Sequence, residues 1–577
     1  MSDMYLANTV KNLAPITPTK AQYVAKVANM TEPLQKAQTV PLHDEQVINN
    51  AGGYVYEVRD LQQFQRFLFL GSEKGTYYVS EQKLTVENIQ CVERLLARNC
   101  GEDMLALMRK INEENRNAKS GPMLFSLAYL AKMGNLDLRR KVYACLQEFL
   151  RIPTQLFEFL TYAKEISKSK KDSVGWGRLQ RDFIQKWYTG KHIDDLTYQV
   201  TKYYQRNGWS HRDVFRLAHV LPEAYERVSE RALLYRWVVK KEVDVTLEID
   251  GQTKTGEFLR AYAKLQGMTG TTGDDEENFA EVVKMINQYR FVREHIPTNL
   301  LNSKPVWEAL LQDMPLGALI RNLNKLTKLG IFDGYFSNEQ LKRVCDKLRD
   351  EKILSKARIH PLKLMIAMRT YSKGKGDKGG MTWTPNQDIL NALNDSYYKS
   401  FKYAKPTGKR FFIGLDVSGS MTCGSCSGTN ITPREASACL ALTMMNLEPN
   451  CILKGFSHEL VDVPISPKRR LDDNINVIDR IPFGATDLSL PIRYAQKKNI
   501  PVDCFIILSD NETYCGSHHP SDCLRAYRKK MGIDACYINV QMTATKFSVA
   551  DPEDLKSLEI AGFDSGMMET IAEFVAW

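Results

Sequence analysis

No long apolar run interrupts this sequence, and it shows no secretory leader. None of its apolar stretches approaches the roughly 18 residues that a membrane-spanning helix needs. The first residues, MSDMYLANTV, lack the basic and apolar regions of a signal peptide. We therefore expect an intracellular protein with no membrane partner, located in the cytoplasm and also in the nucleus.

Paired cysteine motifs are few. We expect most of the 12 cysteines to be buried thiols, because a reducing compartment disfavours disulfides. Cys423 and Cys426 form a C-x-x-C with no second pair nearby, which favours a surface-loop thiol pair over a redox or zinc site. Another cluster has a spacing that zinc could use: Cys515, His518, His519 and Cys523. One loop can rarely surround a tetrahedral ion, so we do not expect zinc there.

Positive charge is concentrated in the first part of the chain. The net charge is +10, but from residue 401 onward 19 basic residues face 21 acidic ones. The first 400 residues therefore hold 59 basic and 47 acidic residues, a net charge of +12. This asymmetry suggests a polyanionic partner for the first part, with a solvated basic surface as the alternative.

The chain has two different textures, and its 577 residues are too many for one core. Residues 1–40 lack periodicity and are predicted to form a mobile tail. Residues 41–405 are predicted to form a helical-repeat region, because apolar residues recur at helical spacing between short breaks. Residues 406–577 alternate short apolar runs with helical stretches, which predicts an α/β domain with a doubly wound, mainly parallel sheet.

Oxygen-bearing side chains follow three predicted elements of the α/β domain. The run FFIGLD ends in Asp416, with Ser418 and Ser420 directly after it, and IILS is followed by Asp510. Between them, PFGATD offers Thr486 and Asp487. Few carboxylates with several hydroxyls form a hard-oxygen site with room for water, which suits Mg²⁺ and also Mn²⁺. An ordinary polar turn explains the first motif alone equally well.

Taken together, the three motifs resemble the metal-ion-dependent adhesion site (MIDAS) of von Willebrand factor A domains. The resemblance implies that Ser418, Ser420 and Thr486 bind the cation directly. Asp416 and Asp510 would bind it through water or orient the hydroxyls. It also implies that an acidic group from a protein partner can complete the coordination.

Two adjacent segments of the helical region combine aromatic side chains with cations. In the first, Trp176, Phe183 and Trp187 share one helical face. In the second, Ser210 to Asp213 reads as a capping box that begins a helix, with His211 in the first turn beside unpaired backbone N–H groups. The candidate RNA-binding residues are Arg178, Arg181, Lys186, Lys202, Arg206, His211, Arg212 and Arg216. A solvated helix face over core aromatics is the alternative for either segment alone.

Within the second segment, Arg212, Arg216 and His219 follow one helical stripe, whereas Val214, Leu217 and Ala218 can face inward.

Several longer stretches resemble a known family. They are GTYYVSEQKL, YQRNGWSHRDVFRLAH, ARIHPLKLMIAM and PTGKRFFIGLDVSGSM. In order, they match the Ro ribonucleoprotein autoantigen family, the TROVE-domain proteins, from about Gly52 to the C-terminus. The resemblance implies a closed ring of HEAT-like helical repeats whose ends are joined by the von Willebrand-like domain.

This resemblance also implies a function without catalysis. Members bind small noncoding Y RNAs on a basic outer surface, and His211 corresponds to the family histidine needed for this binding. They also bind misfolded or defective noncoding RNAs by passing a single-stranded 3′ end through the ring, which serves RNA quality control and stabilisation. The alternatives are a metal-dependent scaffold or adhesion module without RNA, and a metal-dependent phosphotransferase. The second lacks a positioned base or nucleophile in the sequence.

Overall fold

The computed structural model describes most of the chain. The described residues are 36–70, 90–114, 116, 120–171, 175–221, 229–242, 253–268, 276–334, 338–376, 380–401, 405–422, 426, 431–478, 480–482, 484–543, 545, 547–562 and 566–576. Among them, no helix is both long and apolar enough to cross a membrane. The predicted tail 1–40 lies outside these residues up to position 35.

Contacts divide the chain into two compact units, which do not coincide with the regions predicted from sequence texture. The first unit consists of Met1–Met123, Arg349–Ser372 and Leu390–Trp577. The second consists of Leu124–Leu348 and Lys373–Ile389. The first unit therefore contains the C-terminal domain together with helices from both ends of the helical region.

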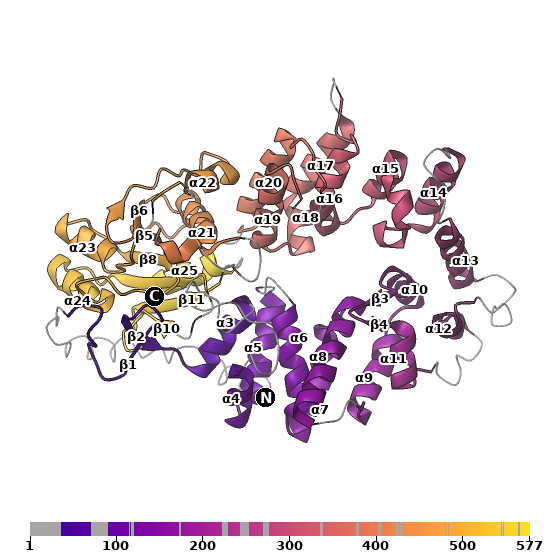
Figure 1. Ribbon diagram of the computed structural model, residues 1–577, viewed down its shortest axis with the longest axis horizontal. Coiled ribbons are helices and arrows are strands. Elements are labelled where there is room, and N and C mark those ends of the chain that lie inside the picture. The colour runs from indigo at the N-terminus through magenta and orange to yellow at the C-terminus, as the bar shows by residue number, and fades with distance from the viewer. Residues whose placement is uncertain are drawn as a thin grey trace. The chain divides into compact units, whose positions relative to one another are not determined.

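The helical region consists of amphipathic helices, and successive helices of the second unit pack on one another (Figure 1). Buried aromatic and aliphatic side chains fill the spaces between them. The helices are α3 (Asp60–Leu70), α4 (Cys91–Ala97), α5 (Gly101–Glu114), α6 (Gly121–Met133), α7 (Leu136–Cys145), α8 (Pro153–Lys171), α9 (Arg178–Thr189), α10 (Ile193–Lys202), α11 (His211–Ala218), α12 (Glu230–Lys240), α13 (Lys254–Gly267), α14 (Glu276–Tyr289), α15 (Lys304–Gln312), α16 (Leu316–Lys328), α17 (Glu339–Arg349), α18 (Glu351–Ala357), α19 (Pro361–Ser372) and α20 (Gln387–Lys399).

The C-terminal domain is built on a six-stranded sheet in the order β11-β9-β8-β5-β6-β7. Five strands are parallel, and β7 pairs antiparallel with β6, so the sheet is mixed. The strands are β5 (Phe411–Asp416), β6 (Cys451–Phe456), β7 (Leu460–Val461), β8 (Cys504–Ser509), β9 (Cys536–Gln541) and β11 (Ser557–Ala561). The predicted fold class, helical repeats followed by an α/β domain, is confirmed. The closure of the repeats into a ring stays a prediction.

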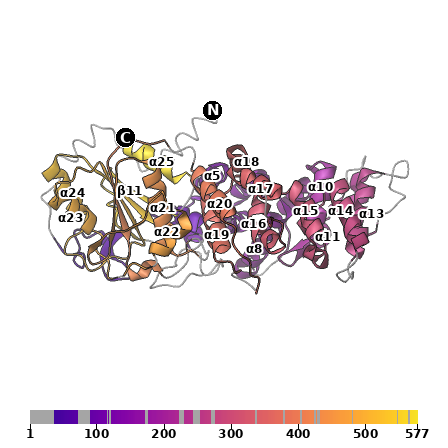
Figure 2. The same ribbon diagram turned by 90° about the horizontal axis from the view of Figure 1, so that it is seen from above.

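Helices cover both faces of this sheet. Figure 2 shows α23 (Leu490–Lys497) and α24 (Pro520–Met531) on one face. The other face carries α21 (Pro433–Leu447), α22 (Leu471–Ile478) and α25 (Met567–Ala576). β5 pairs with β6 on one side and with β8 on the other. The chain first adds β6 on one side of β5 and later adds β8 on the opposite side, so the strand order reverses at β5. Ligands of such sheets gather at the carboxyl ends of the strands at this point.

Two short strands from the N-terminal part belong to the C-terminal domain. β1 (Gln46–Ile48) pairs with β2 (Tyr54–Glu57), and β2 pairs with β10 (Phe547–Ser548). The Val55 side chain is 1% exposed and lies in the same apolar core as Phe412 and Phe505. From the sequence we placed both segments in the helical region. The β10 partner of β2 lies about 490 residues further along the chain, and no local pattern reveals it.

Both ends of the helical region are fastened to the C-terminal domain within the first unit. At the N-terminal end, Arg66 of α3 forms a buried ion pair with Glu559 of β11. At the C-terminal end, Arg369 of α19 pairs with Glu435 of α21 at 2.7 Å. The Tyr397 hydroxyl of α20 also donates to the Cys439 carbonyl of α21. The two ends therefore meet the same domain through different elements.

Candidate metal centre and nucleic-acid surface

The candidate metal centre lies at the carboxyl ends of two neighbouring strands. β5 and β8 are fully buried apolar runs that lie side by side in parallel, with Leu415 opposite Leu508. They end at Asp416 and Ser509, so the polar residues that follow emerge at the same edge. This register brings the first and the third oxygen-bearing loops to one edge of the sheet.

Asp416 is fully buried and organises the first loop. Its Oδ1 accepts the backbone N–H of Ser418 at 2.8 Å, and its Oδ2 accepts the Ser509 hydroxyl at 2.9 Å. The Ser418 and Ser420 hydroxyls are 3.0 Å apart. Asp416 therefore holds the loop in a shape that directs both hydroxyls to one place. Ser509 was not among the predicted site residues, although its position beside Asp510 in the motif could have pointed to it.

Asp510 contributes an oxygen that has no partner. Its Oδ1 accepts the Glu512 backbone N–H at 3.1 Å, whereas its Oδ2 is buried without a hydrogen bond. A buried carboxylate oxygen without a partner costs free energy, and such groups are usually paired or bound to a cation. This atom is the strongest sign that the loops hold a ligand.

The second loop connects the other two. The Gly419 N–H donates to the Gly484 carbonyl at 3.4 Å, and the Thr486 carbonyl accepts from the Thr513 hydroxyl at 3.2 Å. Thr486 is 2% exposed, and its carbonyl also accepts the N–H groups of Tyr514 and Cys515, so it packs against the third loop. Asp487 has a different role, because its Oδ1 accepts both the backbone N–H and the hydroxyl of Ser489.

The electrostatics of the site favour a cation. Burial raises the pKa of Asp416 above its usual range, and the nearby charge of Asp510 raises this pKa further. Burial also raises the pKa of Asp510, and the nearby Ser420 hydroxyl partly opposes this rise. Two buried carboxyl groups that repel each other are stabilised in their charged forms by a bound cation.

The donor set fits a hard divalent cation. It consists of three hydroxyls and two carboxylates, all oxygen, with one carboxylate oxygen left without a partner. Mg²⁺ prefers such oxygen donors and keeps part of its water shell, so it does not need a full set of protein carboxylates. The residues predicted from the sequence are therefore consistent with the group that the MIDAS resemblance implies.

The predictions for the C-x-x-C pair and for the Cys/His cluster have different outcomes. Cys426 is buried, so its assignment to a surface loop is wrong, and Cys423 lies outside the described residues. Cys515 is exposed, Cys523 is buried, and the His519 ring bonds to the Val40 carbonyl at 2.7 Å. In the described part of the chain, no group of three His, Cys, Asp or Glu side chains could hold a metal ion. The weak zinc alternative at this cluster gains no support.

The predicted RNA-binding cations lie mainly on the surface of the second unit. Arg178, Lys186, Arg206, Arg212 and Arg216 are exposed. Arg181 and Lys202 are half-buried. Among the described residues, Arg178 forms one long i,i+4 ion pair of 3.7 Å, and none of Arg206, Arg212 and Arg216 forms an ion pair. Exposed guanidinium groups without acidic partners can bind phosphates without first breaking an ion pair.

The local fold explains how these cations are displayed. β3 (Gln205–Arg206) and β4 (Trp209–Ser210) form a hairpin whose turn residues, Asn207 and Gly208, both have positive φ angles. An Asn-Gly turn adopts this shape readily. The predicted capping box then begins α11, with the Ser210 side chain and Asp213 bonded reciprocally. The hairpin therefore carries the exposed Arg206, and the capped first turn of α11 carries the exposed Arg212.

His211 lies in the first turn of α11, as the capping box predicts, but its side chain is buried. Its side chain is 1% exposed, and its Nδ1 is 2.7 Å from the Tyr188 hydroxyl of α9. The ring also packs edge-on against Phe157. Burial, and then the charge of Lys241, lower the pKa of His211 to about 3, so the ring is neutral. In this structure the imidazole anchors α11 to α9, and its role in RNA binding stays a prediction.

Another correction concerns the inward face of α11. Val214 and Ala218 are buried as predicted, but Leu217 is 46% exposed and Phe215 takes the inward position. Sequence reasoning also missed Lys241, whose Nζ lies 4.0 Å from the ring centroids of both Tyr204 and Trp237. Lys241 is the C-cap of α12, four residues after the buried Trp237, whereas the exposed Tyr204 lies in an earlier segment, so the sequence gives no sign of the contact with Tyr204.

Comparison with known families identifies both regions. The model of the TROVE domain matches residues 47–268 and 283–370, and the model of the Ro60 von Willebrand factor A domain matches residues 410–575. The chain belongs to the TROVE-domain Ro60 family. The resemblance drawn from the sequence motifs is thereby confirmed.

Relatives match nearly the whole chain. An RNA-binding protein RO60 of Caenorhabditis elegans is 36% identical, over 93% of this chain and 91% of the relative. The RNA-binding protein RO60 of Deinococcus radiodurans is 32% identical, over 94% of this chain and 97% of the relative. The crystal structure of the Deinococcus radiodurans RO (RSR) protein matches with a TM-score of 0.66 and 30% identity, over 90% of this chain and 99% of that chain.

Proposed function

We propose that this TROVE-domain protein binds RNA through the exposed cations of its helical region. The observation that carries the proposal is the group Arg206, Arg212 and Arg216, which is exposed and forms no ion pair with another described residue. The net charge of +12 over the first 400 residues adds a long-range attraction for a polyanion. The names of the relatives state RNA binding alone, which supports a non-catalytic role.

The finer proposal concerns the RNAs. We infer that one class of ligand is folded small noncoding RNA of the Y type, bound by the exposed cations. The other class is misfolded noncoding RNA with a free single-stranded 3′ end, which passes through a ring of helical repeats. The family resemblance is the support for both classes. Such binding would serve RNA quality control and stabilisation in the cytoplasm.

The contact surface is tested with single arginine variants. Counterion release makes phosphate binding weaken steeply with salt, so Arg216→Ala should flatten the slope of log K against log salt by about one unit. The matched control is Lys497→Ala, an exposed cation of the C-terminal domain, which should leave affinity and slope unchanged. Fluorescence anisotropy with a hairpin RNA measures both. Equal losses in the two variants would contradict the assignment of this surface.

Threading is tested with two RNAs that differ in one feature. A structured RNA with a single-stranded 3′ tail should lose most of its affinity when the tail is trimmed or base-paired. A folded Y-type RNA should bind equally well whether its 3′ end is intact or has been trimmed or base-paired. If trimming the tail leaves the affinity of the first RNA unchanged, the threading mechanism is wrong and only surface binding remains.

We further propose that the C-terminal domain binds Mg²⁺ at the three loops. Ser418, Ser420 and Thr486 would hold the ion directly, and the Asp416 and Asp510 carboxylates would orient the hydroxyls or bind through water. When bound, the ion supplies positive charge at a site with few carboxylates. An acidic side chain of a protein partner can therefore complete its coordination.

Metal binding is tested by thermal unfolding with and without Mg²⁺. Ligands that bind only the folded state stabilise it, so Mg²⁺ should raise the wild-type melting temperature. Asp416→Ala should abolish this shift, because it removes the group that shapes the first loop. RNA affinity should survive in the same variant, since the candidate RNA residues belong to the other unit. An equal Mg²⁺ shift in both proteins would show that the site lies elsewhere.

The alternative function is a metal-dependent protein-binding scaffold that binds no RNA. The buried oxygen site favours this alternative, because it can accept an acidic ligand without any help from the helical region. Absorbance of the purified protein separates the two functions. Copurifying nucleic acid would raise the 260/280 nm ratio of an RNA-binding protein and leave that of a scaffold unchanged.

A further inference from the structure

A segment from the N-terminal part of the chain lies against the loops of the metal centre. We call residues 36–57 the N-terminal strap. Its Gln38 is fully buried, and the Gln38 Nε2 donates to Asp487 Oδ1 at 2.7 Å and to the His518 carbonyl at 2.9 Å. The Gln38 Oε1 accepts the Thr513 hydroxyl, and the Gln38 backbone N–H donates to the Gly516 carbonyl at 3.0 Å. One side chain of the strap therefore joins the second metal loop to the third.

Asn49 of the strap holds the third loop from the other side. Its Nδ2 donates to the carbonyls of Asn511 and Thr513, at 3.2 and 2.9 Å. The Asn50 side chain and the Ala51 backbone N–H both bind the Glu512 carboxylate. The strap thus binds the three residues that directly follow Asp510 in the chain, and Asp510 carries the oxygen without a partner.

Two glycines show how closely the strap and the loop approach each other. A Cβ atom at Gly53 of the strap would collide with the backbone carbonyl of Thr513. A Cβ atom at Gly516 of the loop would collide with the Gln38 side chain and the Asp487 carboxylate. Neither contact allows an intervening side chain, so the fit is specific on both surfaces.

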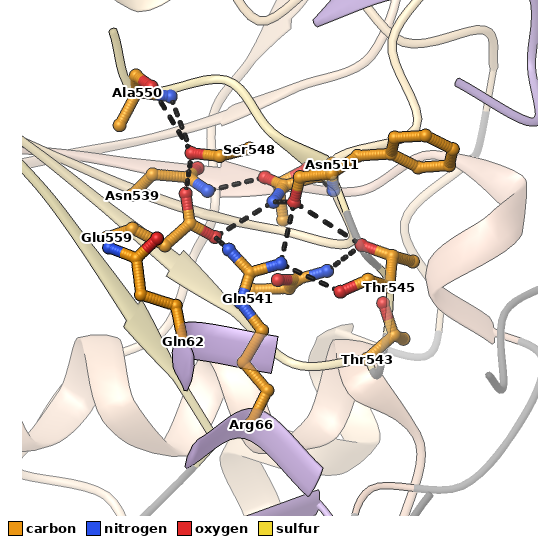
Figure 3. A network of polar contacts seen from close by, with 12 residues as sticks. Gln62, Arg66, Asn511, Asn539, Gln541, Thr543, Thr545, Ser548, Ala550 and Glu559 are labelled. Atoms are coloured by element: carbon orange, nitrogen blue, oxygen red, sulfur yellow. Dashed lines mark hydrogen bonds and ion pairs between the residues drawn. The ribbon is translucent and has the colours of Figure 1, made fainter. Parts of the chain in front are cut away.

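The third loop is also attached to α3. Asn511 has a φ angle of +65°, and its Nδ2 donates to Glu559 Oε1 and to the Phe547 carbonyl, each at 3.0 Å. Figure 3 shows Arg66 reaching the same group, where it pairs with Glu559 at 2.8 Å and donates to the Thr545 carbonyl at 2.7 Å. Asn511 therefore lies between the metal loop and the N-terminal helix of the helical region.

From these contacts we propose that the N-terminal strap is an integral part of the metal centre, with Gln38 and Asn49 as positioning residues. The strap fixes Asp487 and residues 511–513, and these in turn fix Thr486 and Asp510. Metal binding and strap docking are then reciprocally linked, because each favours the same arrangement of the loops. This inference rests on the Mg²⁺ site of the proposed function and adds that the N-terminal part of the chain controls its affinity.

The first test measures Mg²⁺ affinity by calorimetry on the full chain. Removing partners that orient metal ligands typically weakens binding 10- to 100-fold, so we expect a loss of about that size for Gln38→Ala and for Asn49→Ala. Gly53→Ala should have the same effect through the collision with Thr513. The matched control is Tyr527→Phe, which removes the buried bonds to Val502 and Ile500 in the same domain and should leave Mg²⁺ affinity within about twofold of wild type.

The second test measures amide hydrogen exchange, which does not depend on any activity of the loaded protein. Mg²⁺ should slow exchange at Gln38, Asn49 and Tyr54 in the wild type and have no effect there in Asp416→Ala. Without metal, Gln38→Ala should speed exchange at Cys515, whose N–H bonds to the Thr486 carbonyl. A protein with a merely structural strap would show the same strap exchange with and without Mg²⁺.

The outcomes distinguish the two proposals. If Mg²⁺ binds the wild type and strap exchange is unchanged, or if Gln38→Ala binds Mg²⁺ as tightly as Tyr527→Phe does, the strap proposal is wrong and the metal site stands. If Mg²⁺ neither stabilises the wild type nor gives a calorimetric signal, both proposals fall.

Discussion

The two candidate sites of this chain treat charge in opposite ways. In the C-terminal domain, Asp416 and Asp510 are fully buried, and most of their oxygens are held by hydroxyls or backbone N–H groups. On the helical region, Arg206, Arg212 and Arg216 are exposed, and none forms an ion pair with another described residue. The first site depends on many specific hydrogen-bond partners, whereas the second depends only on the packed helices that carry its exposed side chains.

The difference determines what a substitution should do. Removing one member of a buried polar network leaves its partners without hydrogen bonds and costs stability. Removing an exposed cation costs almost no stability but weakens the attraction for a polyanion. His211 stands between the two cases, because it is a buried group that supports an exposed surface.

The largest effect is expected at the network behind the metal loop. Arg66→Met should lower the free energy of unfolding of the first unit by about 3–5 kcal/mol, because Glu559 would be left buried without its cation. Urea unfolding measures this loss. The double variant Arg66→Met, Glu559→Met should recover most of it. A single variant as stable as wild type would show that this network is not the rigid support described above.

An effect that is smaller per pH unit and appears only below about pH 6.5 is expected from the buried histidine of the helical region. The pKa of His211 lies below its ordinary value, so the unfolded chain binds a proton between about pH 6.5 and pH 3 that the folded protein does not. Stability should therefore fall as the pH falls through this window, by up to about 1.4 kcal/mol per pH unit. His211→Asn should remove the part of this slope that His211 contributes, whereas the buried His295, whose pKa is also lowered to about 3, should keep its own part. The control His219→Asn, at an exposed position at the end of the same helix, should retain the whole slope.

The smallest effect on stability is expected from the exposed arginines. Arg212→Ala should change the free energy of unfolding by no more than about 0.5 kcal/mol, because the side chain is exposed and forms no ion pair with a described residue. The same variant should weaken hairpin RNA binding clearly at low salt. A large loss of stability with unchanged RNA affinity would reverse the contrast between the two sites.

The sequence predicted those parts of the metal centre that depend on local order along the chain. A buried strand followed by Asp416, Ser418 and Ser420 fixes its own loop, since the Asp416 carboxylate binds a backbone N–H two residues later. Parallel pairing then brings Asp510 to the same edge. The capping box at Ser210 was predicted for the same reason, because all its bonds lie within four residues.

Contacts between distant segments could not be predicted from the sequence. Gln38 meets Asp487 across 449 positions, and no periodicity or spacing signals that meeting. His211 was placed correctly in the first turn of α11, but its burial depends on Tyr188 and Phe157, which lie on two other helices. The break between α4 and α5, where Asn99 has a φ angle of +60°, also lies within a stretch whose apolar residues recur at helical spacing.

The strap also has a consequence for the order of synthesis. A ribosome adds about 5–20 residues per second, so Gln38 leaves it roughly 20–90 s before Asp487 does. Throughout that time β2 has no β10 to pair with. The Gln38 and Asn49 side chains, which later form hydrogen bonds with the third loop, face solvent or other partners. The C-terminal domain of this protein is therefore completed by a segment that is synthesised long before the rest of it, and it cannot reach its final form until both the strap and β10 have been made.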